Sequence, residues 1–179
     1  RKACLSDIPH LERWDRMPHV IACSGDDDEA DWPAEIERDV SWYEMWIAEV
    51  DGRPIGVMQI IDPAEEESHY WGEVEPNLRA IDIWIGEPDM LGQGYGTTMM
   101  TMALAGCFAD DTVRAVIIDP LQSNTRAIAF YASLGFKEVG PRRFGDDDCL
   151  VMRLDQSDFW HAAAPWLPTP ARHQPAMAE

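Results

Sequence analysis

Three glycines at alternate positions mark the first place where this sequence could do chemistry. They lie in the run Leu91-Gly92-Gln93-Gly94-Tyr95-Gly96-Thr97, and apolar residues at helical spacing begin at Met99. Closely spaced glycines let backbone N–H groups approach a phosphate, and a helix N-terminus adds positive partial charge there. The loop is not a P-loop, because no Gly-Lys-Ser/Thr sequence follows it. The spacing favours phosphate binding, with a plain helix start as the alternative.

A carboxylate inside an apolar segment is the second candidate. Asp82 lies between Ile81 and Ile83 in a run that is otherwise mostly apolar. An unpaired buried carboxylate is costly, so Asp82 either ionises for a function or is a structural hydrogen-bond acceptor facing a water-filled gap. Further carboxylates stand near the ends of predicted strands, at Glu73, Glu75 and Asp119.

The third candidate is the run Ser123-Asn124-Thr125-Arg126-Ala127-Ile128-Ala129-Phe130-Tyr131-Ala132-Ser133-Leu134-Gly135-Phe136. A glycine loop followed by a strand and then by this Asn-x-Arg-Ala-Ile-x-Phe-Tyr pattern resembles the GCN5-related N-acetyltransferases. That family transfers an acetyl group from acetyl-CoA to an amine. The resemblance covers roughly residues 47–154.

The resemblance implies an acetyl-CoA site. It assigns the glycine loop to the pyrophosphate, Asn124 to the pantetheine arm, and Tyr131 to a position beside the departing thiol. On helical spacing alone Tyr131 is more readily a core aromatic, and the resemblance reverses that preference. Leu91 and the neutral Gln93 stand where the family often has polar or basic residues, so phosphate binding here rests more on backbone amides. The predicted acetyl-CoA site comprises Ile83, Trp84, Ile85, Gly92, Gln93, Gly94, Tyr95, Gly96, Thr97, Asn124 and Ala127.

Within the family, three segments look like the aminoglycoside 6'-N-acetyltransferases, and two other readings stay open. The segments are Arg79-Ala80-Ile81-Asp82, the glycine loop with its preceding Leu91, and Asp119-Pro120 with Ser123-Asn124. The nearest alternative is an acyltransferase of siderophore synthesis that acts on a hydroxylamine or lysine derivative. A domain that binds acetyl-CoA or a cation without turnover is the other.

The implied reaction is direct acetyl transfer to an amine of a cationic substrate. An ammonium must lose a proton before it attacks the thioester, and Asp82 is the expected base. The oxyanion would meet backbone N–H groups near Trp84 and Ile85, and Tyr131 would protonate the CoA thiolate. We expect the remaining substrate contacts from Asp119, Glu73, Glu75, Trp71 and Trp84. No metal is implied, because the histidines show no ligand spacing.

Alternating patterns and turn residues place these groups on a mixed α/β sheet. Ser6 or Asp7 is expected to cap a short first helix that ends before Pro18, and residues 23–33 read as a loop. A hairpin is predicted from strands at residues 43–50 and 54–62, joined by Asp51-Gly52. A strand at 78–85, a helix after the glycine loop, a strand at 113–118, a helix from Ser123 to Leu134 and two closing strands follow. This order predicts one domain with a mostly antiparallel sheet, splayed at the acetyl-CoA site and flanked by helices.

The charge and composition of the sequence limit the classes of molecule that the protein is expected to bind. The 179 residues carry 14 Lys and Arg against 33 Asp and Glu, a net charge of −19. Such a surface repels nucleic acids and anionic membranes, and it attracts cations such as an aminoglycoside or another polyamine. The acidic runs Asp26-Asp27-Asp28-Glu29, Glu65-Glu66-Glu67 and Asp146-Asp147-Asp148 are either an electrostatic funnel or solvated loops.

The remaining expectations concern organisation. One catalytic domain is expected over residues 1–160, with a flexible tail over 161–179 that is rich in proline. The cysteines lie far apart, which predicts free thiols in a cytoplasmic protein. The sequence leaves a monomer and a homodimer equally open.

Overall fold

The structure is a computed structural model that describes residues 1–24 and 30–163. Two short 3-10 helices, Leu5–Asp7 and Pro88–Met90, accompany the main elements. The α-helices are α1 (Ile8–Trp14), α2 (Pro18–Ser24), α3 (Trp32–Glu37), α4 (Tyr95–Cys107), α5 (Thr125–Ser133) and α6 (Gln156–Ala163). The strands are β1 (Tyr43–Val50), β2 (Arg53–Ile61), β3 (Leu78–Ile85), β4 (Ala115–Ile118), β5 (Lys137–Phe144) and β6 (Asp147–Asp155).

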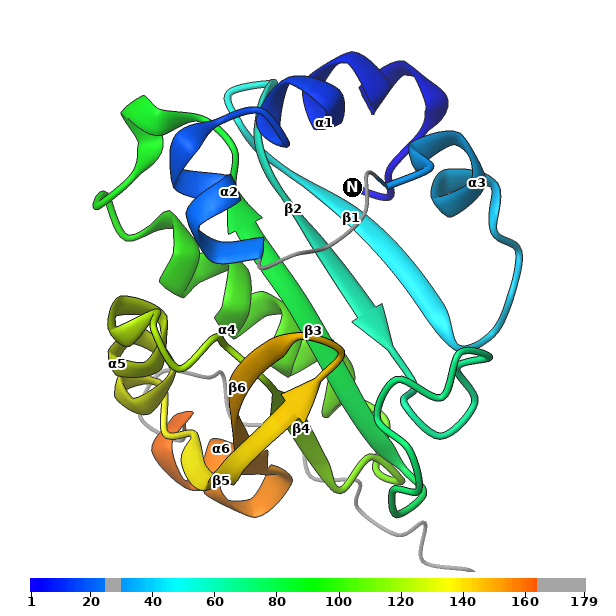
Figure 1. The fold of residues 1–179 in the computed structure, drawn as a ribbon, viewed down its shortest axis with the longest axis vertical. Coiled ribbons are helices and arrows are strands. Elements are labelled where there is room, and N and C mark those ends of the chain that lie inside the picture. Colours follow the sequence, from blue (N-terminus) through cyan, green and yellow to red (C-terminus); the bar gives the residue numbers. More distant parts are fainter. Residues whose placement is uncertain (25–29, 164–179) are drawn as a thin grey trace, which may run out of the picture.

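These strands form one sheet in the order β1-β2-β3-β4-β6-β5 (Figure 1). Neighbours are antiparallel except for β3 and β4, so the predicted mixed α/β class with a mostly antiparallel sheet is confirmed. β3 has 8 residues and β4 has 4, and the two pair only from Leu78↔Ala115 to Ala80↔Ile117. Residues 81–85 of β3 therefore extend beyond their partner strand.

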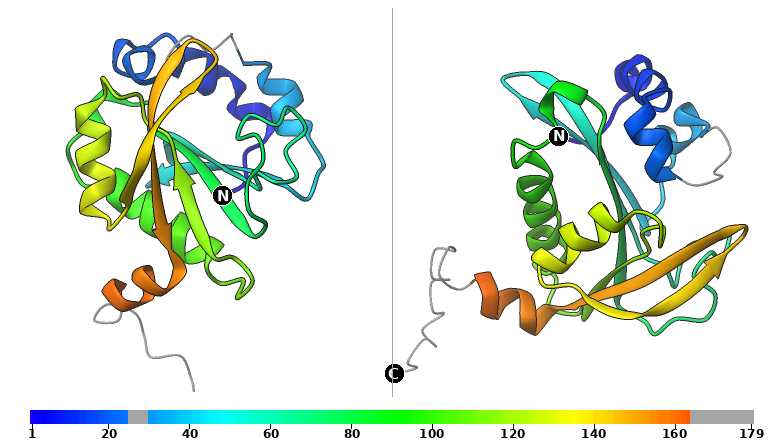
Figure 2. Two further views of the ribbon diagram at one scale, coloured as in Figure 1. Left: turned by 60° about the horizontal axis from the view of Figure 1, so that its bottom comes forward. Right: turned by 60° about the vertical axis from the view of Figure 1, so that its left-hand side comes forward.

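Helices cover both faces of the sheet (Figure 2). α4 and α5 lie on one face, where Ile81 and Ile83 of β3 join the core beneath α4. The first three helices lie on the other face, where Leu11 and Trp14 of α1 pack with Trp32 of α3 against β1 and β2. This second face also carries a separate core cluster around Trp71, Ala80, Ile117 and Phe144.

Three local expectations differ from the structure. A helix, α2, occupies residues 18–24, whereas the sequence predicted that a loop starts at Cys23. Pro18 suits the first position of this helix, because a backbone N–H there would have no partner within the helix and proline lacks one. Asn124 rather than Ser123 caps α5, since its Oδ1 accepts a hydrogen bond from Ala127 N at 3.0 Å. α6 crosses the expected boundary at residue 160, and residues 164–179 of the expected tail lie outside the described residues.

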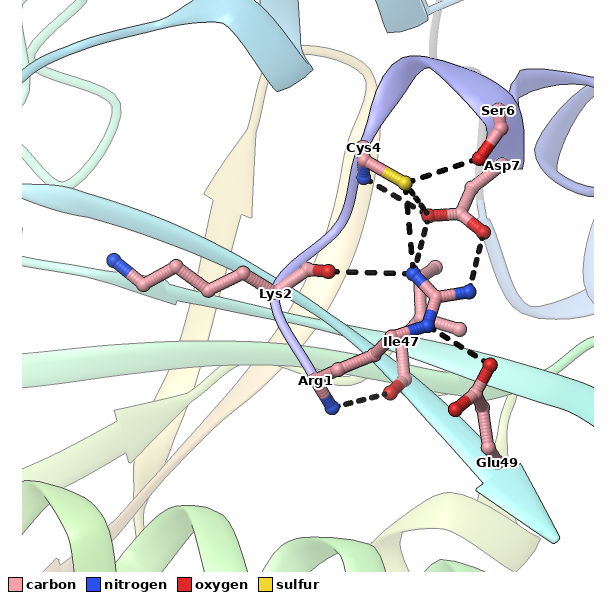
Figure 3. A network of polar contacts seen from close by, with 7 residues as sticks. All are labelled: Arg1, Lys2, Cys4, Ser6, Asp7, Ile47 and Glu49. Carbon is pink, nitrogen blue, oxygen red and sulfur yellow. Dashed lines mark hydrogen bonds and ion pairs between the residues drawn. The ribbon is translucent and has the colours of Figure 1, made fainter. Parts of the chain in front are cut away.

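The first helix is fastened to β1 by a carboxylate that was expected to cap it. Asp7 is only 2% exposed and accepts two hydrogen bonds of 2.7 Å from the Arg1 guanidinium and one of 2.9 Å from Cys4 N (Figure 3). Arg1 also reaches Glu49 of β1 at 2.8 Å. The Arg1 contact, with the Cys4 bonds, outweighs burial and lowers the pKa of Asp7 to about 2. Asp7 is the N-cap residue of α1 without a side-chain bond to that helix; its carboxylate instead binds Arg1 and, through Cys4 N, completes a capping box at the 3-10 helix Leu5–Asp7.

A second buried carboxylate fixes the far end of β3. Glu87 is 5% exposed and accepts hydrogen bonds from Trp14 Nε1 and Arg53 Nη2, each at 2.9 Å, and from Arg13. These partners, Arg13 foremost, lower its pKa to about 2. The adjacent Gly86 has no room for a side chain, because a Cβ would lie 2.0 Å from Trp14 Cγ. α1 therefore sets the direction in which the chain leaves β3 for the glycine loop.

Candidate active site

The edge of β3 that β4 leaves unpaired forms one side of the candidate site. The carbonyl of Ile85 faces away from β2, because its oxygen lies 2.9 Å from His19 Nε2 of α2. Peptide groups of successive strand residues point to opposite sides, so the N–H of Ile85 faces the open side and that of Trp84 faces β2. Of the two amides expected to meet an oxyanion, the geometry favours Ile85 alone.

The glycine loop lies between Pro88–Met90 and α4, close to this edge. Gly92 and Gly94 have φ values of 73° and 87°, which other residues rarely adopt. Gly94 is the N-cap of α4 and has no side chain to cap it, so the first amides of the helix are left to bind an anion. Gln93 turns back and donates to Asp89 O, so its side chain is directed toward the preceding 3-10 helix.

α5 brings Asn124 and Tyr131 to the same region. The Asn124 cap uses the side-chain oxygen and leaves its NH₂ group as a donor. The Tyr131 ring packs against Phe130 and Phe136, with centroids 5.2 Å and 5.7 Å away. Burial raises the pKa of Tyr131, and the nearby charges of Asp82, Asp119 and Cys23 raise it further. The tyrosine is both a packed aromatic and a hydroxyl within the field of two carboxylates.

Asp82 projects from the face of β3 opposite α4. Its neighbours Ile81 and Ile83 face the α4 core, and Gln59 of β2 stands directly opposite it in the register. Asp82 is exposed rather than buried, so the desolvation cost argued from the apolar sequence does not arise. On that face it lies between Trp84, which packs with the cluster formed by α1 and α3, and Ala80, which belongs to the Trp71 cluster.

Asp119 follows β4 directly and is held by a residue that the sequence did not single out. Tyr70 donates a hydrogen bond of 2.7 Å from its hydroxyl to Asp119 Oδ2. The pKa of Tyr70 is raised, by burial first and then by Asp119, with Asp82 also contributing. Asp82 and Asp119 therefore both act on the hydroxyls of Tyr70 and Tyr131, which come from two other segments of the chain.

Comparison with known proteins identifies the family to which this chain belongs. Residues 4–144 match the family described as "Acetyltransferase (GNAT) domain". The chain belongs to the GCN5-related N-acetyltransferases. It is 27% identical over 161 residues to the aminoglycoside N(6')-acetyltransferase type 1 of Klebsiella pneumoniae, covering 86% of this chain and 80% of that one. A kanamycin resistance protein of Rhizobium radiobacter is 34% identical over 95 residues, which cover 52% of this chain and 88% of the relative.

Solved structures agree with that assignment. The aminoglycoside acetyltransferase AAC(6')-Ib, crystallised with coenzyme A and kanamycin, superposes with a TM-score of 0.80 at 26% identity, covering 90% of this chain and 96% of that one. A protein from Bacillus halodurans shares the fold with a TM-score of 0.81 at 19% identity, covering 93% and 88%. The acetyltransferase fold inferred from the glycine loop and the Asn-x-Arg-Ala-Ile pattern is thus confirmed.

Three of the residues expected to contact substrate lie differently from the expectation. Trp71 is 4% exposed and packs in the core against Phe144, with ring centroids 5.2 Å apart, so its ring is not an open surface. Glu75 forms an ion pair with Arg153 of β6, at the opposite end of β3 from the glycine loop. The Trp84 ring contacts the Trp32 ring, with centroids 6.2 Å apart. Its buried Nε1 has no hydrogen-bond partner within the described residues.

The other expected residues have simpler positions. Glu73 is exposed in the connection before β3. Arg143 forms ion pairs with Asp146 at 3.0 Å and Asp148 at 3.8 Å at the tip of the β5–β6 hairpin. The acidic run 26–29 lies outside the described residues. Across residues 1–24 and 30–163, no three His, Cys, Asp or Glu side chains gather as a metal site, and no helix is long and apolar enough to span a membrane.

Proposed function

We propose that this chain transfers the acetyl group of acetyl-CoA to the 6'-amino group of an aminoglycoside, which would confer resistance. The observation that carries the proposal is the edge of β3 that β4 leaves unpaired, beside an α4 N-terminus that no side chain caps. The similarity to proteins described as aminoglycoside N(6')-acetyltransferases supports the substrate class. The net charge of −19 supports a polycationic substrate over a nucleic acid.

The residues present fit acetyl-CoA. The amides at the start of α4 suit its pyrophosphate, because a helix N-terminus and positive-φ glycines together form an anion site. The Asn124 NH₂ group and the part of the β3 edge that β4 leaves unpaired before Ile85 suit the amide groups of the pantetheine arm. Acetyl-CoA supplies the activated acyl group, and its presence in the cytoplasm places the proposed reaction there.

Asp82 acts as the base in this proposal. Its exposed carboxylate lies where a substrate ammonium can reach it directly or through one water, and it takes the proton that the amine must lose before attack. Asp119 binds a second ammonium, with its carboxylate oriented by Tyr70. The Ile85 N–H points to the side on which the oxyanion would develop.

Tyr131 completes the transfer at the thiolate. Its raised pKa keeps the hydroxyl protonated at neutral pH, so it is always available as a donor. A thiolate is less basic than such a tyrosinate, so full proton transfer to it is uphill. The hydroxyl therefore helps chiefly by a hydrogen bond to the developing thiolate, and its contribution is expected to be modest.

The test is thiol release from acetyl-CoA on adding kanamycin. The matched control is an aminoglycoside with a hydroxyl in place of the 6'-amino group, which should release no thiol above background. Lysine and hydroxylamine acceptors complete the panel. Turnover with a hydroxylamine alone would replace the proposal with the siderophore-type acyltransferase, and acetyl-CoA binding without thiol release to any acceptor would leave a binding domain.

A further inference from the structure

We infer that Tyr70 determines substrate specificity in two ways: its hydroxyl orients Asp119, and its ring offers an aromatic surface to an aminosugar ring. This inference rests on the proposed function, because it concerns the acceptor side of the same site. Tyr70 lies in the connection between β2 and β3, where the notable sequence features were acidic residues and Trp71.

The hydroxyl contact holds one oxygen of the Asp119 carboxylate. Tyr70 Oη lies 2.7 Å from Asp119 Oδ2, a short bond of the kind formed by charged acceptors. Asp119 immediately follows β4, and Pro120 after it has a restricted backbone. Backbone and side chain of Asp119 are therefore both constrained, so a substrate ammonium meets a carboxylate already in position.

The ring is presented by a rigid stack. Tyr70 lies parallel to Phe144 of β5, with centroids 4.4 Å apart and planes at 7°. Arg142 lies over the Phe144 ring at 4.6 Å and donates a hydrogen bond of 2.7 Å to Trp71 O. This bond ties the β2–β3 connection to the β5–β6 hairpin, so the ring of Tyr70 is held by both.

One face of the Tyr70 ring is left for a ligand. The residue is 47% exposed, and its aromatic contacts within the described residues are the stack on Phe144 and an edge contact with Trp71 at 5.8 Å, so the ring face opposite Phe144 has no aromatic partner there. Asp82 and Asp119 lie close enough to influence its hydroxyl. An aromatic face beside two carboxylates suits a molecule with an apolar ring face and ammonium substituents, which describes an aminosugar better than a linear polyamine.

Two substitutions separate the two roles. Tyr70→Phe removes the hydroxyl and keeps the stack, whereas Tyr70→Leu removes both. The ligands are kanamycin and spermidine, with Kd measured by calorimetry in the presence of CoA, and kcat and KM measured for kanamycin. Tyr43→Phe is the control, because it also removes a tyrosine hydroxyl held by side-chain partners, Gln59 at 2.9 Å and Glu35, but in the α1–α3 core cluster.

We expect Tyr70→Phe to weaken both ligands about 3–10-fold with kcat within about twofold of the parent. In an Asp119→Asn background the same change should have no further effect, because the hydroxyl then has no carboxylate to orient. Tyr70→Leu should weaken kanamycin by about a further tenfold and leave spermidine at the Tyr70→Phe value. Tyr43→Phe should leave both Kd values unchanged.

Each result decides the inference. Parent-like Kd values for Tyr70→Phe and Tyr70→Leu overturn it, and so does a Tyr70→Phe effect that persists unchanged in the Asp119→Asn background. Equal further losses for both ligands in Tyr70→Leu overturn the ring role. If the parent binds kanamycin without acetylating it, the proposed function fails and the Kd series still decides the role of Tyr70. If the parent does not bind kanamycin at all, both are overturned.

Discussion

Gly86 gives a direct test of how the end of β3 is positioned, because a single added methyl group has no space there. In Gly86→Ala the new Cβ would lie 2.0–2.3 Å from three ring atoms of Trp14, a residue that is 0% exposed. Overpacking in a dense core costs about 1–3 kcal/mol. Moving the indole also strains its 2.9 Å hydrogen bond to Glu87, which adds about 1–2 kcal/mol.

The sum is a destabilisation of roughly 2–5 kcal/mol, or a fall in Tm of about 10 °C for a domain of this size. Gly106→Ala is the matched control: its Cβ meets nothing within 4 Å, and Gly106 lies inside α4. Because alanine is the better helix former by about 1 kcal/mol, this variant should melt a few degrees higher than the parent.

Differential scanning calorimetry measures both effects: the expected fall in Tm for Gly86→Ala and the expected rise in Tm for Gly106→Ala. Gly86→Ala should also raise KM for acetyl-CoA, since the distorted corner leads directly into the glycine loop, whereas Gly106→Ala should leave KM unchanged. If Gly86→Ala melted within about 2 °C of the parent, the contact between α1 and the end of β3 would not be as tight as described, and the account of how the loop is positioned would be refuted.

Three further predictions concern chemistry and acid stability. Asp82→Asn should lower kcat about 10²–10⁴-fold with Tm unchanged, because the carboxylate is exposed; a steady-state assay with most of kcat retained removes it as the base. Tyr131→Phe should lower the single-turnover rate up to about tenfold with an unchanged Kd for acetyl-CoA, and equal rates would leave it a packing residue. Glu87→Gln should cost roughly 2 kcal/mol in urea unfolding at pH 7. Because the folded pKa of Glu87 is about 2 and its ordinary value 4.5, that gap should be constant above pH 5 and shrink as pH falls below 4.5; a gap independent of pH contradicts the charge argument.

The sheet was largely predictable because its signals are local. The β1 and β3 bounds at residues 43–50 and 78–85 agree with the expectation, since apolar residues alternate or run continuously there and Asp51-Gly52 marks the turn. α2 was missed because it has 7 residues and its apolar content carries no clear period. The Asn124 cap was displaced by one position from the prediction, as expected where Ser and Asn stand side by side.

The residues of the candidate site could be predicted only where they belong to a local sequence motif. The glycine loop, Asn124, Tyr131 and Asp82 could be proposed because each stands out from its own neighbours. Tyr70 could not, since its contacts with Asp119 and Phe144 bridge 49 residues or more of chain. The burial of Trp71 could not be predicted for the same reason. Tyr70 and Trp71 are adjacent aromatic residues, and the packing of Trp71 against Phe144 of the distant β5–β6 hairpin makes it the buried one of the two.

The opening of the sheet follows from the residues that end β4. Its pairing with β3 ends at Ile117, and Pro120 has no N–H with which to resume a ladder, although its carbonyl still accepts a hydrogen bond of 2.9 Å from Leu150 N of β6. β3 runs on past this point and leaves the Ile85 peptide facing His19 instead of a strand. Unpaired peptide groups inside a fold are costly unless something bonds them. The carboxylate of Asp119 therefore stands just beyond the point where β4 leaves β3 and stays with β6, next to the strand edge that the proposed function assigns to acetyl-CoA.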